Sequence, residues 1–553
     1  MRITSKGRTL AALAVVTAFA VGPLVPFLDK AFHIDDYSYL RAAQQIRRDP
    51  FRPYDFLINW RGTFEPAWQM MNKPPLIPYV LAAASAAFRM SEYGESERVL
   101  HGVFLVFPLV AGVSMYWLAG HYVRRPLWPT LGLLSCAAWL VGSTNLMLDN
   151  PSLALYLAAL AAMVSGEKRG SGWRMAVAAI LMGVASWANY LCLSLIPLAA
   201  AYLVMRRRWR GLVWLAIPAV MFGLWCVQGW WVQGVPDIVV ALGHRAGRGE
   251  MPYFFPSLVA LLTFTGGCVL PVVVLAPWVL RGWRGWVASG AAAGVVAAVL
   301  GVAGRHLTPA GFPVPPLGIA LGAVFAFGAV AGFWQLGLFV RAGAAEGFLL
   351  VLWAGGVAVF LLFFNWTVAA RFVVFLAPPV LIGAFAGLEK QTASAGVRYA
   401  VAAALSVTVT LGVSLAAAAA DYRWANEQRR RAEFLRDELP CRLEDSYFLC
   451  HWGLQYYLEW WGLKAFDLNA PTVRIGSCLI ETAVTSCPPI PPALRPHLSL
   501  YRQWEYQRGL SVQLQNPRCG AGFYTHKYGP LPYTVSSVVQ ENYLVHRILA
   551  HDR

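Results

Sequence analysis

The chain has 553 residues, of which 58% are hydrophobic and only 13% are charged, and its formal net charge is +17. Soluble domains carry about 25% charged residues, so this composition excludes an ordinary soluble protein. The Lys and Arg residues lie mainly in short clusters beside long apolar runs. This arrangement indicates a polytopic helical membrane protein and argues against nucleic-acid binding.

The first apolar run, Leu10–Leu28, follows a basic N-terminus. It imitates a secretion signal, but it has no convincing small-residue cleavage site and is long enough to cross a bilayer. We therefore predict a first transmembrane helix whose basic flank places the N-terminus in the cytoplasm.

The next segment, 29–98, is predicted to be an extracytoplasmic loop that carries two interfacial helices. Tyr37–Ile46 has the amphipathic pattern of a helix that lies along the membrane. Pro74–Phe88 is apolar but proline-rich, and it falls short of the roughly 20 residues that a crossing helix needs. It is predicted to be half-inserted on the outer face.

The later spans follow from the rule that short basic loops stay in the cytoplasm. Consecutive basic clusters must then be separated by an even number of crossings, which splits Met175–Met205 into two short spans near Ala188–Asn189. About thirteen crossings result, at roughly 10–28, 99–120, 127–147, 151–165, 175–188, 191–205, 211–231, 254–279, 287–303, 317–340, 347–364, 372–388 and 399–420. An odd number puts the chain beyond Asp421 outside the cytoplasm.

The fold class is thus mainly α, with a transmembrane domain over 1–420 and a small extracytoplasmic α/β domain over 421–553. Asp421–Leu439 has a charged amphipathic helix pattern, and short strand-like runs such as Ser446–Cys450 follow it. Five of the nine cysteines lie in this second domain, where disulfides are favoured. Two local pairs, Cys441–Cys450 and Cys478–Cys487, are candidates, but spacing leaves the connectivity open.

Two adjacent carboxylates, Asp35 and Asp36, follow the first span directly. They are either solvated loop residues or functional groups, because charge beside the hydrocarbon is costly and tends to mark function. The helix predicted after them would hold them at its N-terminus, where acidic groups are favoured.

Three further charged residues fall on the same predicted face. Lys73 precedes a double proline and suits a lipid phosphate, although a snorkelling lysine would look alike. Asp149 could act in the site or cap a helix that begins at Pro151. Arg371, at the outer end of a span, could clamp a phosphate or anchor the boundary.

The outer loop 232–253 adds a weaker signal. It carries His244 and Arg245, with Arg248 and Glu250, and its basic residues lie on the side where such residues are rare. An anionic ligand is one explanation. The chain has no phosphate-cradling glycine loop, no HExxH zinc pattern and no GxSxG nucleophile elbow.

Taken in order, these motifs resemble those of the glycosyltransferase C superfamily, in particular bacterial members related to protein O-mannosyltransferases and to the lipid A aminoarabinose transferase. The resemblance rests on an acidic pair followed by an aromatic residue and on four later segments. These segments are Lys73–Leu76, Asp149–Pro151, Arg371–Pro378 and His451–Tyr457. The chain departs from the family in carrying Asp36 where many members have Glu, and in the wide gap between Asp35 and Lys73.

The resemblance implies a membrane enzyme that moves one sugar from a polyprenyl-phosphate carrier to a hydroxyl of a lipid, glycan or protein, with inversion, on the outer face of the cytoplasmic membrane. Asp35 would be the base that deprotonates the acceptor hydroxyl, and Asp36 would support it. Lys73 and Arg371 would hold the leaving phosphate. Asp149, Tyr39, His244 and Arg245 complete the predicted substrate-binding set.

Alternatives remain at this point. A polyprenyl-diphosphate oligosaccharide ligase or polymerase would use a similar site, and a lipid or solute transporter would share the many spans. No cofactor is predicted with certainty, and Asp35, Asp36 and Asp149 could ligate a divalent metal ion.

Overall fold

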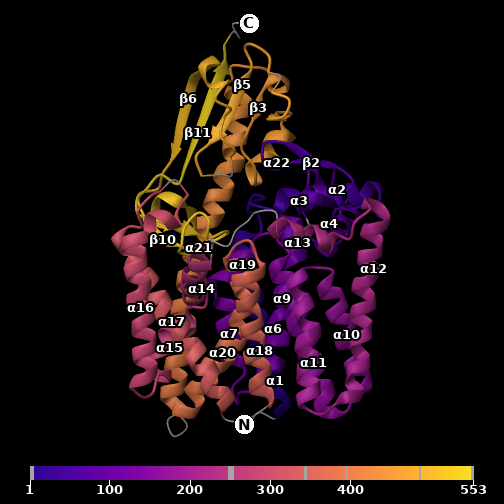
Figure 1. Ribbon diagram of the computed structural model, residues 1–553, viewed down its shortest axis with the longest axis vertical. Helices are drawn as coiled ribbons and strands as arrows, with labels where there is room; N and C mark the ends of the chain where they lie inside the picture. The colour runs from indigo at the N-terminus through magenta and orange to yellow at the C-terminus, as the bar shows by residue number, and fades with distance from the viewer. Residues whose placement is uncertain are drawn as a thin grey trace.

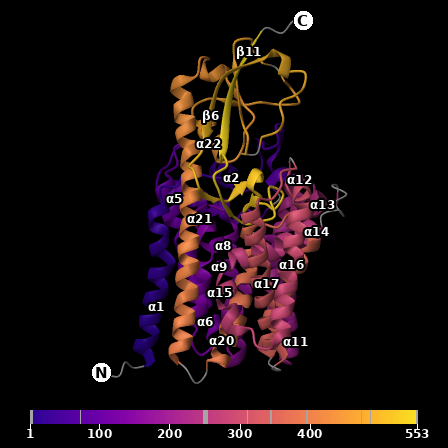
Figure 2. The same ribbon diagram turned by 90° about the vertical axis from the view of Figure 1, so that its left-hand side faces the viewer.

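The structure is a computed structural model that describes residues 5–71, 73–246, 254–309, 311–341, 345–392, 396–471, 473–484 and 487–549. A bundle of long helices carries a β-sheet domain at one end (Figure 1). The N-terminal helix begins at the opposite end of the bundle from that sheet (Figures 1 and 2).

Within the described residues, eight helical segments are long and apolar enough to cross a membrane. They are Gly7–Phe27, Glu97–Ala119, Trp209–Gln233, Trp283–Leu307, Pro316–Phe339, Gly347–Phe364, Ala370–Gln391 and Gly396–Glu438. A ninth candidate is the pair α14 (Phe254–Cys268) and α15 (Pro271–Val279), which the sequence predicted as one span but which bends by 84°. The chain is therefore a multi-pass, mainly helical membrane protein.

The other predicted spans are shorter or interrupted helices. The segment 127–147 forms α7 (Leu127–Ser135) and α8 (Ala137–Gly142), and α9 covers Asp149–Arg169. The predicted break near Ala188–Asn189 is confirmed, because α10 (Gly172–Ser186) ends just before it and a 3₁₀ turn, Tyr190–Ser194, follows. The bundle also contains the helices α1 (Ser5–Val21), α5 (Glu97–Phe104), α6 (Val106–Ala119), α11 (Leu195–Met205), α12 (Ala216–Gln233), α13 (Asp237–Ala246), α16 (Trp283–Ala303), α17 (Pro316–Arg341), α18 (Ala345–Val359), α19 (Ala370–Val373) and α20 (Ala377–Gln391).

The segment after the first span folds at the end of the bundle that carries the sheet domain (Figure 1). Both predicted helices are present here, as α2 (Asp36–Arg48) and α4 (Leu76–Ala87), and they pack against each other. Between them lie a short hairpin of β1 (Leu57–Asn59) and β2 (Phe64–Pro66) and the one-turn helix α3 (Ala67–Met71).

The C-terminal part is built on α21 (Gly396–Glu438), a single helix of 43 residues that crosses the bundle and continues beyond it to the sheet (Figure 2). The mixed five-stranded sheet has the order β4-β3-β5-β11-β6. Its strands are β3 (Tyr447–Phe448), β4 (Lys464–Ala465), β5 (Cys478–Thr482), β6 (Leu498–Tyr506) and β11 (Glu541–Ile548), and α22 (Gly453–Trp460) lies between β3 and β4 in sequence.

Between β6 and β11 the chain returns to the membrane bundle. Two small antiparallel pairs form there, β7 (Ser511–Gln513) with β10 (Thr534–Ser536) and β8 (Gln515–Asn516) with β9 (Ala521–Gly522). The Tyr533 hydroxyl donates to the Gly267 carbonyl at the end of α14 over 2.8 Å. This return brings C-terminal side chains to the ends of the membrane helices nearer the sheet domain.

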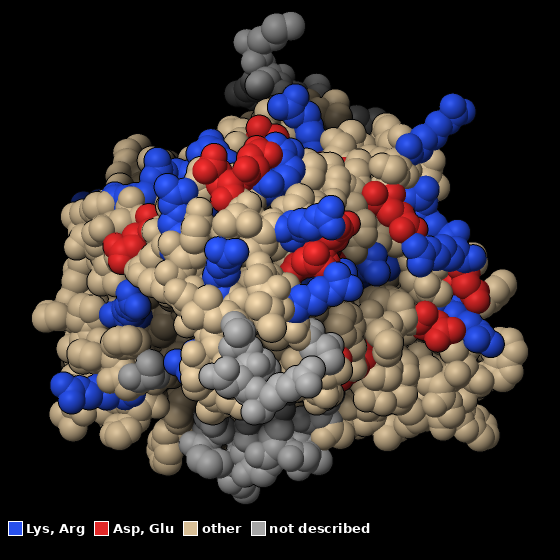
Figure 3. All heavy atoms as spheres, turned by 90° about the horizontal axis from the view of Figure 1, so that it is seen from above, with Lys and Arg blue, Asp and Glu red and all other residues tan. Residues whose placement is uncertain are grey.

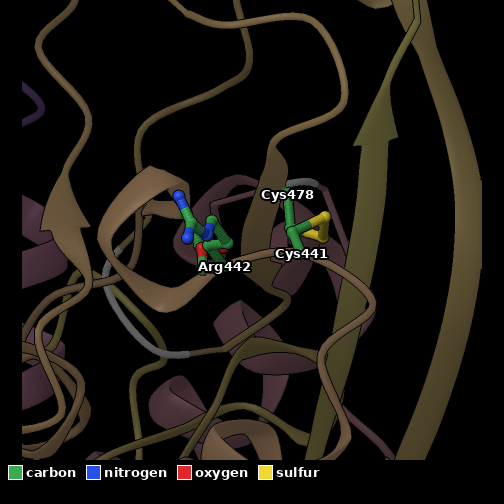
Figure 4. The surroundings of a disulfide bond; sticks show 4 residues. Cys441, Arg442 and Cys478 are labelled. Atoms are coloured by element: carbon green, nitrogen blue, oxygen red, sulfur yellow. A yellow bond between two sulfur atoms is a disulfide. The ribbon is translucent and has the colours of Figure 1, made fainter.

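One disulfide joins Cys441, just after α21, to Cys478 at the start of β5 (Figure 4). The two local pairs considered from the sequence do not form, since Cys450 and Cys487 are free thiols. The reason is tertiary: β5 pairs with both β3 and β11, and this placement carries Cys478 to the end of α21.

Candidate active site

A cavity of about 590 Å³ lies where the ends of the membrane helices nearer the sheet domain meet the segment 29–98 and the returning C-terminal chain. Four of the residues predicted for the site line it, namely Asp35, Tyr39, Lys73 and Arg371. The fold thus brings together side chains that lie far apart in the sequence, such as Asp35 and Arg371, which are separated by 336 residues. The cavity is the candidate active site.

Asp35 sits in a strained turn just before α2. Ile34 has a backbone φ of 49°, which is costly for a β-branched residue. The turn is closed by a hydrogen bond from the Asp36 amide to the His33 carbonyl over 3.1 Å. Strain of this kind persists only where the surrounding structure enforces it, and it clusters at functional sites. Here it separates two neighbouring carboxylates into different surroundings.

The Asp35 carboxylate lines the cavity and forms an ion pair with the Arg371 guanidinium. Arg371 lies in the first turn of α19, and its Nε is 4.0 Å from the Asp149 carboxylate. The side chains of Asp35 and Arg371 are 21% and 14% exposed, so the pair remains reachable from the cavity. A guanidinium between two carboxylates can exchange one of them for another anion.

Lys73 lies on the same wall of the cavity. Its Nζ is 5.6 Å from the centre of the Phe372 ring, next to Arg371, and its carbonyl accepts a hydrogen bond from the Tyr54 hydroxyl over 2.7 Å. Burial lowers the pKa of the Lys73 ammonium, and Asp149 opposes this effect. An anion bound beside Lys73 would therefore stabilise its charged form.

Asp149 begins α9 and accepts a hydrogen bond from the Asn189 amide over 3.1 Å. The predicted cap of a helix that begins at Pro151 is wrong, because α9 already begins at Asp149 and its N-cap residue is Leu148. The carboxylate is buried and is not among the residues that line the cavity, so it acts on the site through neighbours that do, namely Arg371, Asn189 and Lys73.

Asp36 points away from the cavity. Its two carboxylate oxygens accept hydrogen bonds from the backbone amides of His33 and Leu146, each over 2.9 Å, and the side chain is completely buried. Burial raises the pKa of Asp36 to about 7. In this position the residue joins the start of α2 to the loop before α9. A direct role for Asp36 in catalysis remains a prediction that this geometry does not favour.

The remaining residues predicted for the site are Tyr39, His244 and Arg245. Tyr39 is buried and lines the cavity one helical turn after Asp35. His244 and Arg245 belong to α13, but their side chains lie outside the described part of the structure, as do Arg248 and Glu250. Across the described residues, no three His, Cys, Asp or Glu side chains are grouped to hold a metal ion.

The sequence did not reveal the buried network beneath the cavity. The Lys30 ammonium is 2.5 Å from the Asp421 carboxylate of α21, and neither side chain is exposed. The Tyr524 hydroxyl, on the returning chain, donates to the same carboxylate over 2.7 Å. Lys30 and Asp421 each lie next to a predicted membrane span, and this position is the one feature of the sequence that points to them. Their pairing could not be predicted, because 391 residues separate Lys30 from Asp421.

Aromatic side chains line much of the cavity, a feature that the sequence did not predict. They come from three parts of the chain and are Trp60, Phe360, Phe364, Trp366, Trp452, Tyr524 and Tyr528. A cavity with apolar and aromatic walls and a few converging charges is typical of a small-molecule or cofactor site.

Comparison with solved structures finds two kinds of similar protein. The oligosaccharyltransferase of Archaeoglobus fulgidus, crystallised with Zn and sulfate, matches over 82% of this chain with 14% identity and a TM-score of 0.49. This chain spans 62% of the length of that protein. ArnT from Cupriavidus metallidurans, bound to undecaprenyl phosphate, matches over 90% of this chain and 96% of its own, with 17% identity and a TM-score of 0.45.

The apo form of the same ArnT gives a TM-score of 0.45 with 16% identity over 89% of this chain and 96% of that one. No protein-family model matches the sequence, and no curated protein sequence matches it either. Because these structural similarities are distant, the function proposed next is argued from the side chains around the cavity.

Proposed function

We propose that the protein is a membrane glycosyltransferase that moves a single sugar from a polyprenyl-phosphate donor to a hydroxyl group of a lipid, glycan or protein. One observation carries the proposal: a carboxylate, Asp35, and two cations, Arg371 and Lys73, line one cavity at the outer end of the bundle. Base and phosphate-binding groups are the two elements that such a transfer needs.

The cations serve the leaving group. The donor phosphate gains negative charge as its bond to the sugar C1 breaks, and fixed cations in a water-poor cavity stabilise that charge. Arg371 can bind two phosphate oxygens with its planar fork, while Lys73 acts as a point charge. Asp149, next to Arg371, would position the guanidinium.

Asp35 serves the acceptor. When a donor phosphate replaces Asp35 as the partner of Arg371, the carboxylate is free to take the proton of the acceptor hydroxyl. The acceptor oxygen then forms its bond to C1 while the bond from C1 to the phosphate oxygen breaks, and the polyprenyl phosphate leaves. This direct displacement inverts the configuration at C1.

The walls of the cavity fit this division of substrates. Phe360, Phe364 and Leu242 line its apolar side, where membrane-embedded elements could receive a polyprenyl chain. Trp60 and Trp452 come from the outer loop and the C-terminal domain, so we assign them with Tyr39 to sugar or acceptor. ArnT, which binds undecaprenyl phosphate, takes a ligand of the same class as the proposed donor.

The decisive experiment separates the base from the phosphate site. Asp35→Asn should lower sugar transfer by the roughly 10²–10⁴-fold expected for a lost general base. The same variant should still bind polyprenyl phosphate, because Lys73 and Arg371 remain. Transfer and binding would be measured with purified protein in detergent, with Asp55→Asn as the control, since Asp55 is an exposed carboxylate outside the cavity.

Near-normal transfer by Asp35→Asn would overturn the assignment of the base. Absence of any transfer or carrier hydrolysis in the wild-type protein, tested with several polyprenyl-phosphate sugars, would favour a transporter instead.

We also propose the membrane topology that the basic loops indicate. Thirteen segments would cross the cytoplasmic membrane, with the N-terminus in the cytoplasm and both the loop 29–98 and the domain 421–553 outside it. Two observations support this arrangement: each predicted span corresponds to a helix or a broken helix, and the first helix begins at the end of the bundle opposite the sheet (Figure 1).

A further inference from the structure

A second cavity, of about 580 Å³, lies at the end of the bundle opposite the C-terminal sheet. Its walls come from the turns after α6 and α15, the last turns of α17 and α20, and the first turn of α21. Figure 2 shows the end of α20 and the start of α21 at the bottom of the bundle. The proposed transfer reaction makes no use of this cavity.

Four cations border the cavity: Arg124, Arg125, Arg281 and Lys390. The cavity has one carboxylate, Glu389, whose two oxygens accept the backbone amides of Arg124 and Arg125 over 3.0 and 2.9 Å. Among the described residues, none of these four cations has a carboxylate within 4 Å. Their charge is therefore left uncompensated by ion pairs.

Other charged clusters of the molecule differ in this respect. At the same end of the bundle, Arg206 and Arg208 both contact Glu167, at 3.4 and 3.0 Å. On the face that carries the sheet domain, acidic and basic side chains alternate (Figure 3). The general preference for basic residues in cytoplasmic loops explains the presence of cations. It does not explain a cavity lined by cations that lack ion-pair partners.

A buried hydroxyl in the same cavity also lacks a partner. Tyr399 is 2% exposed and lines the cavity, and its hydroxyl has no hydrogen-bond partner among the described residues. The Arg125 guanidinium lies 4.4 Å from the centre of the Tyr399 ring. A buried polar atom without a partner is costly, so a ligand atom that bonds the hydroxyl would be favoured.

Most of the remaining wall comes from two helices and is apolar, apart from the Gln335 side chain of α17. Leu338 and Phe339 come from α17, while Gly383, Ala386 and Gly387 come from α20. Gly383 and Gly387 let α17 approach α20 closely, since an added Cβ would lie 3.2 Å from Leu336 at the first position and 2.7 Å from Gln335 at the second. The cavity thus combines a cationic rim with an apolar floor, which suits an amphiphile that has an anionic head group.

We propose that this cavity binds the phosphate head group of an anionic phospholipid, with Arg125 and Lys390 on the phosphate and the Tyr399 hydroxyl as a further donor. Basic pockets between transmembrane helices bind anionic lipid head groups in this way. The chemistry recognised is a phosphate monoanion or dianion, and the apolar floor assigns its source to a lipid.

The test uses the purified full-length protein in a neutral detergent and counts bound ligands by native mass spectrometry. Three ligands are compared: short-chain phosphatidylglycerol, short-chain phosphatidylcholine and inorganic phosphate. We expect phosphatidylglycerol to bind about tenfold more tightly than phosphatidylcholine, and Arg125→Gln combined with Lys390→Gln to remove this preference. Binding at the outer cavity would not respond to these substitutions.

Two further variants make the outcome specific. Tyr399→Phe keeps the ring under Arg125 and should weaken phosphatidylglycerol binding without changing the charge. Arg284→Gln is the matched control, because Arg284 is an exposed arginine close in sequence to Arg281 that does not line the cavity. Equal binding of the two lipids, or unchanged binding in the double variant, would overturn the proposal. Competition by inorganic phosphate at equal concentration would assign the cavity to free phosphate and overturn the lipid source.

Discussion

Two neighbouring carboxylates of the same residue type occupy opposite environments in this protein. Asp35 faces a cavity and a guanidinium, whereas Asp36 is sealed inside and accepts two backbone amides. The left-handed backbone at Ile34 sets the turn from which the two side chains diverge. A helical or extended backbone at this point would have placed them differently, so their separation depends on one strained residue.

Asp36 should make stability depend on pH. Its pKa is raised from 3.8 to about 7 in the folded protein, so the folded state holds a proton that the unfolded state releases between these values. The contribution of Asp36 is complete below about pH 4 and is lost as the pH rises through about 7. We expect the melting temperature in detergent to fall between pH 5 and pH 8 by more in the wild type than in Asp36→Asn.

The variant is also expected to be less stable at pH 5, by about 1–3 kcal/mol, because an amide nitrogen would face a backbone donor. Asp55→Asn, on an exposed carboxylate, should keep the wild-type slope. Parallel melting curves for the wild type and Asp36→Asn across this range would contradict the buried, protonated carboxyl.

At the scale of elements, α21 connects the bundle to the C-terminal sheet domain. Asp421 lies in the middle of this helix and is held by Lys30 from the end of the first span and by Tyr524 from the returning chain. His33, two residues before Asp35, approaches the same carboxylate at 3.5 Å. The network therefore anchors the loop that carries Asp35 to α21.

Breaking this pair on one side should be costly. Lys30→Met leaves a buried carboxylate without its cation, and we expect a loss of about 3–5 kcal/mol in the free energy of unfolding. Adding Asp421→Leu should recover much of the loss, since no uncompensated charge remains. Chemical denaturation in detergent measures both variants.

The control variant is Arg48→Met, which breaks a solvent-exposed ion pair instead of a buried one. The side chains of Arg48 and Glu92 are 60% and 41% exposed. The expected effect of Arg48→Met is at most about 1 kcal/mol. A similar loss in the free energy of unfolding for Lys30→Met and Arg48→Met would show that the buried ion pair stabilises the protein no more than the exposed one.

At the scale of the whole molecule, the two ends of the bundle carry different chemistry. The cavity with Asp35 lies at the sheet end and the cavity with Arg125 lies at the other, and the span Ala370–Gln391 reaches from Arg371 in the first to Lys390 in the second. The proposed topology would put the first on the outer face of the membrane and the second on the cytoplasmic face.

Cysteine labelling tests this orientation. In intact cells, a membrane-impermeant maleimide should label Ser537→Cys, in the C-terminal domain, and should label Arg169→Cys, at the end of α9, only after permeabilisation. Both positions are exposed, and the unmodified chain measures labelling of the native cysteines. The reverse pattern would invert the proposed membrane orientation.

The sequence by itself determined the class of protein and the main elements. Long uncharged runs require helices in a membrane, because backbone polar groups must be paired within each segment there. Local patterns also predicted α2, α4 and the break before Tyr190. The residues Asp35, Lys73 and Arg371 were found because charge beside the hydrocarbon is rare and therefore visible in a sequence.

Only the tertiary structure decided which of these charges meet. It joined Asp35 to Arg371, turned Asp36 inward, bent the α14–α15 pair, and paired Cys441 with Cys478 instead of a near neighbour. Contacts across hundreds of residues depend on how helices pack and where the C-terminal chain returns. No local periodicity carries that information, and for this reason the Lys30–Asp421 pair and the second cavity became visible only in the folded molecule.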